Sequence, residues 1–505
     1  MIVLLHNFST VTDIVGVEHE KVKTECLGKP MAFSLYKVAE YFPDKIVVWC
    51  YKELYAQVDF DFIVRAFPHN RYMYSFNPSG NFFPDAIGYI EESPYIKVNK
   101  KVHYPTWQMS SVVGAIHSST ILKISKSFWE KREHFDWVLS AVAKQYQPLG
   151  MFCYSEPQLL KDPMLSLSFP KANAVELFSF VAQHYKWVWK HFLVLSMGIY
   201  DKKFPLAAWV LSFFKKQGST SDEALSFDHN PITIDWEQET IDVIIPTIGR
   251  KTYLRDVLKD LSVQTHLPKN VIIVEQNPQE GSVSELDYLE SESWPFSIRH
   301  IFTHQTGACQ ARNRALEWVE SKWCFLNDDD NRFDSNLLKN AILNLRQLEV
   351  QAIITYYPVK SEVQKYFHIS QTTIFGSGNA FVNSNVLKFI RFNLKLEFGY
   401  GEDTEFGLQL RNKGVDVIYI PDLKILHLKA PIGGFRTKFV HPWSNESIQP
   451  KPSPTIMFVK QKFSTKHQIL GYKIRLFFKT HKYKIWKFSS FQKQWQQSEY
   501  WVKTL

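Results

Sequence analysis

Three consecutive aspartates, Asp328, Asp329 and Asp330, follow a short apolar run in the segment CFLNDDDNRF at residues 324–333. Adjacent carboxylates repel one another, so one interpretation of this cluster is a solvated turn. The other is a metal site, because hard divalent cations prefer oxygen ligands. The predicted strands and helices around the aspartates help to choose between these two interpretations.

Strand and helix patterns alternate along the chain around the aspartates. Buried-strand patterns occur in IDVIIPT (241–247), NVIIVEQNP (270–278) and KWCFLN (322–327), and helical spacing occurs in KTYLRDVLKDLSVQT (251–265) and ACQARNRALEWVES (308–321). This alternation predicts an α/β fold with a parallel, doubly wound sheet, in which ligands gather at the carboxyl ends of the strands. Thr247, Glu275 and the three aspartates all lie at such ends, which favours the ligand-binding interpretation.

The second half of the chain resembles the family 2 glycosyltransferases of the GT-A fold. The resemblance rests on the ordered set VIIPTIGR, VIIVEQNP, TGACQARNRAL, FLNDDDN, GEDTEFGLQLRNKG and ILHL, which runs from residue 243 to residue 428. It implies a Rossmann-like nucleotide-diphospho-sugar transferase domain. The implied activity is an inverting transfer of a sugar to a hydroxyl of a glycan or lipid-linked acceptor in cell-surface polysaccharide synthesis.

The resemblance assigns the aspartate cluster to a cation, Mn²⁺ or Mg²⁺. Departure of the donor's diphosphate builds negative charge on phosphate oxygen, which a bridging cation neutralises. The Asp-x-Asp motif of the family corresponds here to Asp328 and Asp330, with Asp329 contacting metal or ribose. A register that begins at Asn327 remains open. The resemblance also implies that His427, at the end of LKILHL, is a further ligand of the metal or the diphosphate.

The pair Glu402 and Asp403 begins a predicted helix in the segment GEDTEFGLQLRNKG. An acceptor hydroxyl must lose its proton as it attacks the sugar, and a carboxylate within hydrogen-bond reach can take that proton. The resemblance assigns this role to Asp403 and an orienting role to Glu402. A helix N-terminus also favours acids for structural reasons alone.

The resemblance implies a donor site, with a UDP-sugar favoured, and an acceptor site. The predicted nucleotide-sugar-binding residues are Pro246, Thr247, Arg250, Glu275, Gly307, Arg312, Asp328 and Asp329, and the predicted acceptor-binding residues are Gly378 and Asn379. Glu275 stands where the family usually has Asp, which leaves the base identity open. Gly307 is expected to let the backbone approach the ligand, and Arg312 to contact oxyanions.

The first half of the chain repeats parts of the second half in the same order. Residues 42–54 read like residues 267–278, residues 111–124 like 376–389, and residues 135–160 like 402–426. We therefore predict a degenerate GT-A-like copy, in which Asp136 aligns with Asp403 but Phe135 replaces Glu402. The copy has no equivalent of NDDDN at the expected place. The alternative is a bifunctional tandem enzyme whose second active site uses Asp59 and Asp61.

These patterns predict four segments. They are a degenerate GT-A-like domain (1–164), a helical connector and linker (165–230), a catalytic GT-A domain (240–440) and a basic, aromatic C-terminal extension (441–505). A different class of function, a non-catalytic glycan or sugar-nucleotide binding protein, is disfavoured by the intact set of acids and His427.

The composition is globular, with 45% hydrophobic and 22% charged residues, and the formal net charge is +9. The five cysteines are scattered without metal-type spacing, which fits reduced thiols in a cytoplasmic protein. The positive charge fits an anionic partner, but no nucleic-acid-binding module is recognisable, so we expect no nucleic acid. No apolar run reaches membrane-spanning length; residues 191–214 come closest, interrupted by Asp201, Lys202 and Lys203.

The C-terminal tail is strongly basic. From Gln461 onward, ten Lys or Arg residues and one acid, Glu499, are interleaved with aromatic residues. Such a helix can lay its apolar side into an anionic membrane surface, which would make the protein peripheral on the inner face of the cell membrane. The alternative is that these aromatic side chains pack on the protein.

Overall fold

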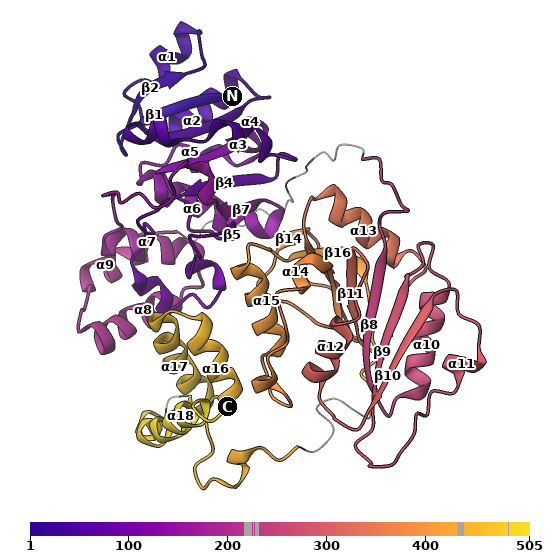
Figure 1. Ribbon diagram of the computed structural model, residues 1–505. Helices are drawn as coiled ribbons and strands as arrows, with labels where there is room; N and C mark the ends of the chain where they lie inside the picture. The colour runs from indigo at the N-terminus through magenta and orange to yellow at the C-terminus, as the bar shows by residue number, and fades with distance from the viewer. Residues whose placement is uncertain (217–224, 226, 228–231, 432–438, 483) are drawn as a thin grey trace. The chain divides into compact units, whose positions relative to one another are not determined.

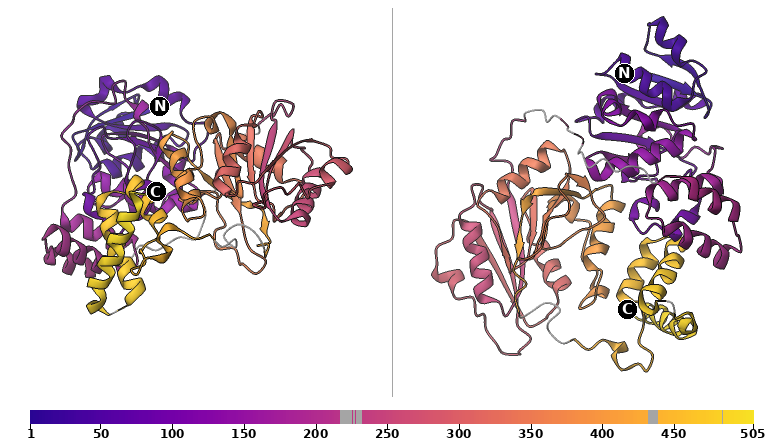
Figure 2. Two further views of the ribbon diagram at one scale, coloured as in Figure 1. Left: turned by 60° about the horizontal axis from the view of Figure 1, so that its bottom comes forward. Right: turned by 180° about the vertical axis from the view of Figure 1, so that it is seen from behind.

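The computed structural model describes residues 1–505 except 217–224, 226, 228–231, 432–438 and 483. The chain divides into two compact units, residues 1–229 with 463–482 and residues 230–462 with 483–505. Each unit contains a sheet with helices packed on it (Figures 1 and 2). The helices of the predicted connector therefore belong to the first unit, and the predicted C-terminal extension is divided between both units.

The second unit is built on an eight-stranded mixed sheet of order β10-β9-β8-β11-β15-β13-β16-β14. Its strands are β8 (Ile241–Ile248), β9 (Asn270–Gln276), β10 (Ser297–Thr303), β11 (Trp323–Asn327), β13 (Ala352–Tyr356), β14 (Ser370–Gln371), β15 (Asn379–Asn383) and β16 (Ile418–Lys424). Strands β10, β9, β8 and β11 are parallel, as the sequence predicts. β15 runs antiparallel to both β11 and β13, so the sheet is mixed, and the predicted parallel direction holds for its first four strands.

Helices cover the sheet of the second unit on both faces, which explains why β8 and β9 are apolar almost throughout. The helices of this unit are α10 (Lys251–Ser262), α11 (Tyr288–Ser291), α12 (Ala308–Leu316), α13 (Leu337–Gln347), α14 (Ser384–Leu387), α15 (Glu402–Asn412), α16 (Pro454–Phe463) and α18 (Phe488–Val502). In α10 the buried residues are Leu254, Val257, Leu258 and Leu261, the i, i+3, i+4, i+7 spacing of an amphipathic helix. A short ladder pairs β12 (Asn331–Arg332) with β17 (Leu426–His427) beside the end of β11.

The first unit is built on a seven-stranded sheet of order β2-β1-β3-β6-β4-β7-β5. Its strands are β1 (Ile2–His6), β2 (Val11–Val15), β3 (Ile46–Tyr51), β4 (Tyr72–Phe76), β5 (Tyr104–Pro105), β6 (Val113–His117) and β7 (Phe152–Ser155). Its helices are α1 (Glu20–Cys26), α2 (Met31–Tyr41), α3 (Phe60–Arg65), α4 (Ser118–Lys123), α5 (Lys126–Trp129), α6 (Phe135–Tyr146), α7 (Ala174–His184), α8 (Trp189–Ser196), α9 (Leu206–Leu211) and α17 (Lys466–His481).

Six strands of the first sheet have the same order as six strands of the second. β1-β3-β6-β4-β7-β5 corresponds to β8-β11-β15-β13-β16-β14, and each neighbouring pair has the same parallel or antiparallel direction. The sheets differ at β2, which is antiparallel to β1, whereas β9 is parallel to β8. This topology agrees with two of the three sequence pairings, 111–124 with 376–389 and 135–160 with 402–426.

The third sequence pairing is wrong. That pairing matched residues 42–54 with residues 267–278, which contain β9. Residues 42–54 contain β3, and in the strand order of the sheet β3 corresponds to β11 and not to β9. Both are short buried runs beside a parallel neighbour, so their local patterns do not distinguish them. Register then shows what replaces the aspartates: Cys50 lies opposite Val113 as Asn327 lies opposite Asn379. Tyr51, Lys52 and Glu53 therefore stand where the second unit has the aspartate cluster.

The C-terminal tail contributes one helix to each unit. In the first unit, Ile474 and Phe477 of α17 are buried, and Gly471 lies so close to the Tyr89 backbone that a Cβ atom would collide with it. In the second unit, Phe491 and Trp495 of α18 are buried. Among the described residues, no helix combines the length and the apolar character that crossing a membrane requires. Binding of the tail to a membrane surface stays a prediction.

Candidate active site

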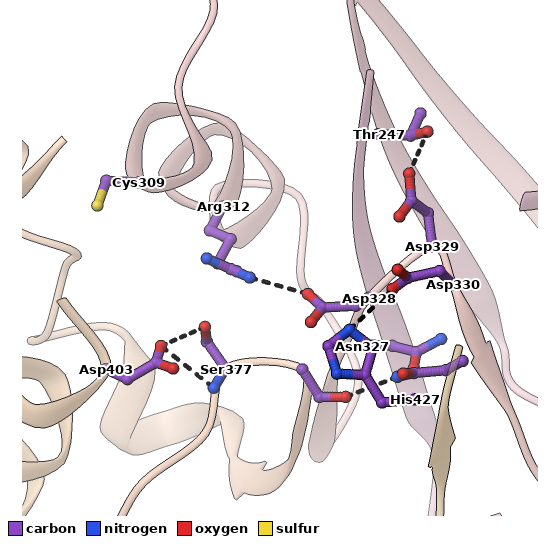
Figure 3. Close-up of polar contacts among 12 residues, drawn as sticks. Thr247, Cys309, Arg312, Asn327, Asp328, Asp329, Asp330, Ser377, Asp403 and His427 are labelled. Carbon is purple, nitrogen blue, oxygen red and sulfur yellow. Dashed lines mark hydrogen bonds and ion pairs between the residues drawn. The ribbon is translucent and has the colours of Figure 1, made fainter. Parts of the chain in front are cut away.

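The end of β11 and the β12–β17 ladder bring two aspartates and a histidine together. The ladder pairs Asn331 with His427, and as a result one ligand atom from each of Asp328, Asp330 and His427 lies within 4.8 Å of the others. Asp330 Oδ1 is buried without a hydrogen bond and lies 3.4 Å from His427 Nε2 (Figure 3). Two carboxylates and an imidazole could hold a divalent cation. Asn327 is not part of this group, because its Oδ1 accepts a hydrogen bond from Asn331.

Asp329 points away from this group, toward β8. Thr247 Oγ1 donates to Asp329 Oδ2 at 2.6 Å, and Arg250 Nη1 donates to Asp329 Oδ1 at 2.5 Å. Burial raises the pKa of Asp329 to about 6, although the charge of Arg250 and these hydrogen bonds act in the opposite direction. The middle aspartate thus faces the side of the site where the sequence places the nucleotide, together with Thr247 and Arg250.

Asp330 remains a carboxylate in spite of its burial. Burial acts to raise its pKa, but the nearby imidazole of His427, the hydrogen bond from the Ala430 amide and the charge of Arg250 hold that pKa below its ordinary value. The Ala430 amide lies 2.8 Å from Asp330 Oδ2, and Arg250 Nη1 lies 3.4 Å from the same oxygen. An ionised carboxylate with one free oxygen is the form that a cation requires.

Arg312 of α12 lies between the predicted metal ligands and the predicted base. Its Nη2 donates to Asp328 Oδ1 at 2.9 Å, and its Nε is buried without a hydrogen bond. Burial acts to lower the pKa of Arg312, but the charges of Asp328 and Asp403 raise it above its ordinary value. The guanidinium is therefore fully charged, and it carries an unused donor inside the site.

Asp403 stands in the first turn of α15, where Ser377 holds its carboxylate. The Ser377 hydroxyl and backbone amide both donate to Asp403 Oδ1, the amide at 3.3 Å (Figure 3). Burial raises the pKa of Asp403 above its ordinary value, against the charge of Arg312 and the bonds from Ser377. Burial and the neighbouring Asp403 raise the pKa of Glu402 to about 7. A carboxylate with a raised pKa is better matched to accepting a proton near neutral pH.

The sequence interpretation missed Tyr357, which follows β13. The Tyr357 hydroxyl lies 3.2 Å from Asp328 Oδ2 and 2.7 Å from Asn331 Oδ1, and its ring stacks on His427. A Cβ atom on Gly378 would collide with Asp328 and crowd the Tyr357 hydroxyl. Gly378 thus leaves room for a metal-ligand carboxylate; its predicted contact with an acceptor stays a prediction. No motif marked Tyr357, because its role depends on the pairing of β12 with β17.

The carboxylate of Glu275 is engaged within the protein. It accepts hydrogen bonds from Ser284 Oγ at 2.6 Å and the Glu285 amide at 3.1 Å, and it pairs with His300 Nε2 at 2.9 Å. Burial acts to raise the pKa of Glu275, but these three partners hold that pKa below its ordinary value. A contact between Glu275 and the base of a nucleotide stays a prediction. Pro246, also predicted to contact the nucleotide, lies in β8 and is half-buried.

The sequence predicted that a ligand approaches the backbone at Gly307, but a side chain does so. Gly307 has φ +138°, and a Cβ atom there would collide with the carboxylate of Glu397. That carboxylate accepts from the amides of Cys309 and Gln310 at 3.0 and 2.8 Å, at the N-terminus of α12. Glycine at this position therefore makes room for Glu397, and the approach of a ligand to Gly307 stays a prediction.

Asn379, predicted to contact the acceptor, is buried in the sheet. Its Nδ2 donates to the carbonyl oxygen of Thr355 on β13 at 2.9 Å, and only 3% of the residue is exposed. The amide thus joins β15 to β13, and this position offers no surface to an acceptor. Sequence spacing could not show that Asn379 is buried. Alternate residues of a strand face opposite sides of the sheet, and the sequence does not tell which side is covered.

The first unit repeats one feature of this site. Asp136 of α6 accepts hydrogen bonds from the Ser111 amide at 2.9 Å and the Ser111 hydroxyl at 2.5 Å, as Asp403 does from Ser377. His134 Nδ1 lies 3.0 Å from Asp136 Oδ2, the oxygen that accepts from the Ser111 hydroxyl. Among the described residues, the group of Asp328, Asp330 and His427 is the one that could hold a metal ion. The copy therefore retains the counterpart of Asp403 and lacks the aspartates.

Comparisons with known proteins match parts of this chain to glycosyltransferases. Residues 242–406 match the model of the glycosyl transferase family 2. An uncharacterized glycosyltransferase of Haemophilus influenzae is 28% identical over 123 residues, which cover 24% of this chain and 40% of that relative. The chain thus spans two fifths of the length of the curated relative it matches.

Two solved structures are similar to parts of this chain. S. aureus TarS 1–349 in complex with UDP-GlcNAc gives a TM-score of 0.38 at 17% identity, covering 51% of this chain and 79% of that one. The mannosyltransferase PcManGT from Pyrobaculum calidifontis in complex with GDP-Man and Mn²⁺ gives a TM-score of 0.31 at 17% identity, covering 38% and 58%.

Proposed function

From the premise that residues 242–406 form a glycosyl transferase family 2 domain with the GT-A fold, we propose that the protein is an inverting glycosyltransferase. Its donor is a nucleoside diphosphate sugar, with a UDP-sugar first among the candidates. Its acceptor is a hydroxyl of a glycan or of a lipid-linked precursor in the synthesis of a cell-surface polysaccharide.

One observation carries this proposal furthest. The guanidinium of Arg312 links the group of Asp328, Asp330 and His427 to Asp403. It donates a hydrogen bond to Asp328, and the negative charge of Asp403 raises its pKa. A leaving group and an attacking hydroxyl must lie on opposite sides of one sugar carbon. The site provides groups for both, because it has cation ligands and Arg312 for the diphosphate and a carboxylate for the hydroxyl.

Asp328, Asp330 and His427 would hold the cation, Mn²⁺ or Mg²⁺, which supplies positive charge to the departing diphosphate. Arg312 would add a second positive group there, through the donor that it does not use in the free protein. Arg250 and Thr247 fix Asp329 on the nucleotide side of the cluster.

Asp403 would accept the proton of the acceptor hydroxyl. The new bond forms between the acceptor oxygen and the anomeric carbon while the bond from that carbon to the diphosphate oxygen breaks, and the nucleoside diphosphate leaves. The Ser377 hydroxyl and amide hold one oxygen of Asp403, so the other is available to the acceptor. Glu402, adjacent in the first turn of α15, orients the acceptor or the base.

The alternative of two active domains receives no support from the register of the first unit. Tyr51, Lys52 and Glu53 occupy the place of the three aspartates, and Asp59 serves instead as the N-cap of α3, where it accepts from the Phe62 amide at 2.8 Å. We therefore propose a single active site, in the second unit, with the first unit serving packing or acceptor binding.

The proposal is tested by release of nucleoside diphosphate from a panel of UDP-, GDP- and dTDP-sugars in the presence of Mn²⁺. Wild-type protein should release the nucleotide from one donor, and Asp330→Ala should not. Asp422→Ala is a matched control, because Asp422 is an exposed acid on β16 of the same unit. Absence of release from every donor, with or without candidate acceptors, would contradict the proposal.

A further inference from the structure

The segment from Trp187 to Phe214 exposes large apolar side chains. Trp187 is 71% exposed, Phe204 is 66% exposed and Phe214 is 80% exposed, and Leu206, Val210 and Phe213 are each about half exposed. We call these six residues the connector surface. Single exposed apolar residues are normal on proteins, but a dense group of large ones in one short segment indicates an interaction site.

The connector surface belongs to one packed structure within the first unit. The ring of His191 on α8 contacts Trp187, Trp209 and Phe213, and Lys190 Nζ lies 3.7 Å from the centre of the Phe213 ring. Figure 1 shows α8 and α9 beside α7, with which both helices make contact. The exposed side chains are therefore held on a folded layer.

The helix α9 exposes large apolar residues on its outward face. Its inward side carries Trp209, which packs against the core, and the small residues Ala208 and, one residue beyond the helix, Ser212, which are 4% and 1% exposed. Its outward positions carry Leu206, Val210 and Leu211. An amphipathic helix on the surface of a globular protein places its large apolar residues toward the core. Large apolar residues on the outward face indicate that this face meets an apolar environment.

The charges around the connector surface identify the kind of environment. Residues 186–216 contain one acid, and the exposed lysines of the segment are Lys186, Lys202, Lys203, Lys215 and Lys216. The one acid, Asp201, accepts a hydrogen bond from Tyr89 at 2.8 Å and so faces the protein. Aromatic and aliphatic side chains bordered by lysines match a bilayer interface, where apolar groups enter the acyl region and cations meet anionic headgroups. Protein–protein interfaces are instead depleted in lysine.

We propose that the connector surface binds the interface of an anionic phospholipid bilayer, with the lysines of residues 186–216 at the headgroups. This inference goes beyond the proposed function and does not depend on it. It places membrane contact in the connector of the first unit, and not in α17, whose residues Ile474 and Phe477 are buried in the protein.

The test is co-sedimentation of the full chain with two kinds of vesicle, phosphatidylcholine alone and phosphatidylcholine mixed with phosphatidylglycerol in equal parts. Wild-type protein should bind the mixed vesicles, and binding should fall as salt is added. The triple variant Leu206→Ser, Val210→Ser, Phe214→Ser should lose affinity by about tenfold or more. Each of Lys203→Ala and Lys216→Ala should lose about fivefold.

A matched control comes from the exposed apolar residues of the tail. Ile485 and Trp486 are 68% and 73% exposed, so Ile485→Ser, Trp486→Ser removes similar side chains outside the connector. This variant should bind mixed vesicles like the wild type. The proposal is overturned by a wild type that stays in the supernatant, or by loss of binding in the tail variant alone. A connector variant that binds like the wild type also overturns it.

A second measurement does not depend on removing apolar surface. Brominated lipids quench tryptophan fluorescence at the membrane interface, and Trp187→Phe keeps the connector apolar while removing one reporter. Quenching should decrease in Trp187→Phe and stay unchanged in Trp486→Phe. Light scattering provides the last outcome, since a wild-type dimer that the triple variant converts to a monomer, without vesicle binding, would show that the surface binds a second copy.

Discussion

The ring of Tyr357 lies parallel to the imidazole of His427, with the ring centres 4.9 Å apart and an angle of 7° between the planes. The hydroxyl of the same tyrosine reaches Asp328 Oδ2 and Asn331 Oδ1. One side chain thus fixes the orientation of two of the three proposed metal ligands. Groups that orient metal ligands in this way influence metal affinity without touching the metal.

Tyr357→Phe should therefore weaken Mn²⁺ binding by about 10- to 100-fold, because it keeps the stacked ring and removes the hydroxyl that orients Asp328. Isothermal titration calorimetry with Mn²⁺ measures this directly. Tyr366→Phe is the matched control, since Tyr366 is exposed in the same unit. Equal Mn²⁺ affinity of the wild type and Tyr357→Phe would show that the hydroxyl has no orienting role.

Asp403→Asn should lower sugar transfer by about 10²- to 10⁴-fold while donor binding survives, because the amide cannot accept the acceptor's proton. The chain supplies an internal comparison in Asp136, which is held by Ser111 as Asp403 is held by Ser377. Asp136→Asn should leave the transfer rate per folded molecule unchanged. Wild-type transfer by Asp403→Asn would move the role of base elsewhere, with Glu402 the first candidate.

The pH dependence of transfer should show an acid limb well above 3.8, the ordinary pKa of an aspartate. Burial raises the pKa of Asp403, and the base must be deprotonated to act, so the rate should rise with pH through that raised value. Glu402→Gln should move the limb to lower pH, because it removes a negative charge that is coupled to Asp403. Rates measured across pH at saturating Mn²⁺ provide the test. A limb that does not move in Glu402→Gln would contradict this coupling.

The double variant Asp59→Ala, Asp61→Ala should keep full transfer to every acceptor that the wild type uses. It should lose about 1 kcal/mol of unfolding free energy, because Asp59 caps the N-terminus of α3. Thermal unfolding and transfer assays separate the two effects. If one of two distinct transfers were lost, the first unit would hold a second active site.

Much of the second unit could be predicted from local patterns. The alternation of buried strands and amphipathic helices predicted β8, α10, β9 and β11 close to their observed bounds, and the strand ends placed Thr247 and the aspartates at one edge. These features depend on neighbouring residues in the sequence. Local patterns could not predict features that depend on contacts between distant segments. These features are the antiparallel direction of β15, the hydrogen bond from Ser377 to Asp403, and the contacts of Tyr357.

The predicted internal copy shows the same limit. Short apolar strands resemble one another, so residues 42–54 could be matched to β9 although they form the counterpart of β11. Register, which requires the neighbouring strand, was needed to align Tyr51 with Asp328. The glycines were also identified without their partners: Gly307 makes room for Glu397, and Gly378 makes room for Asp328.

We propose that Asp328, Asp330 and His427 hold a cation that the transfer of a sugar requires. This is tested by nucleoside diphosphate release from the preferred donor as Mn²⁺ is titrated into metal-free protein. Release should be negligible without metal, saturate with Mn²⁺ in the wild type and in Asp422→Ala, and stay negligible in Asp330→Ala. Full release in the presence of EDTA, or unchanged Mn²⁺ dependence in Asp330→Ala, would contradict it.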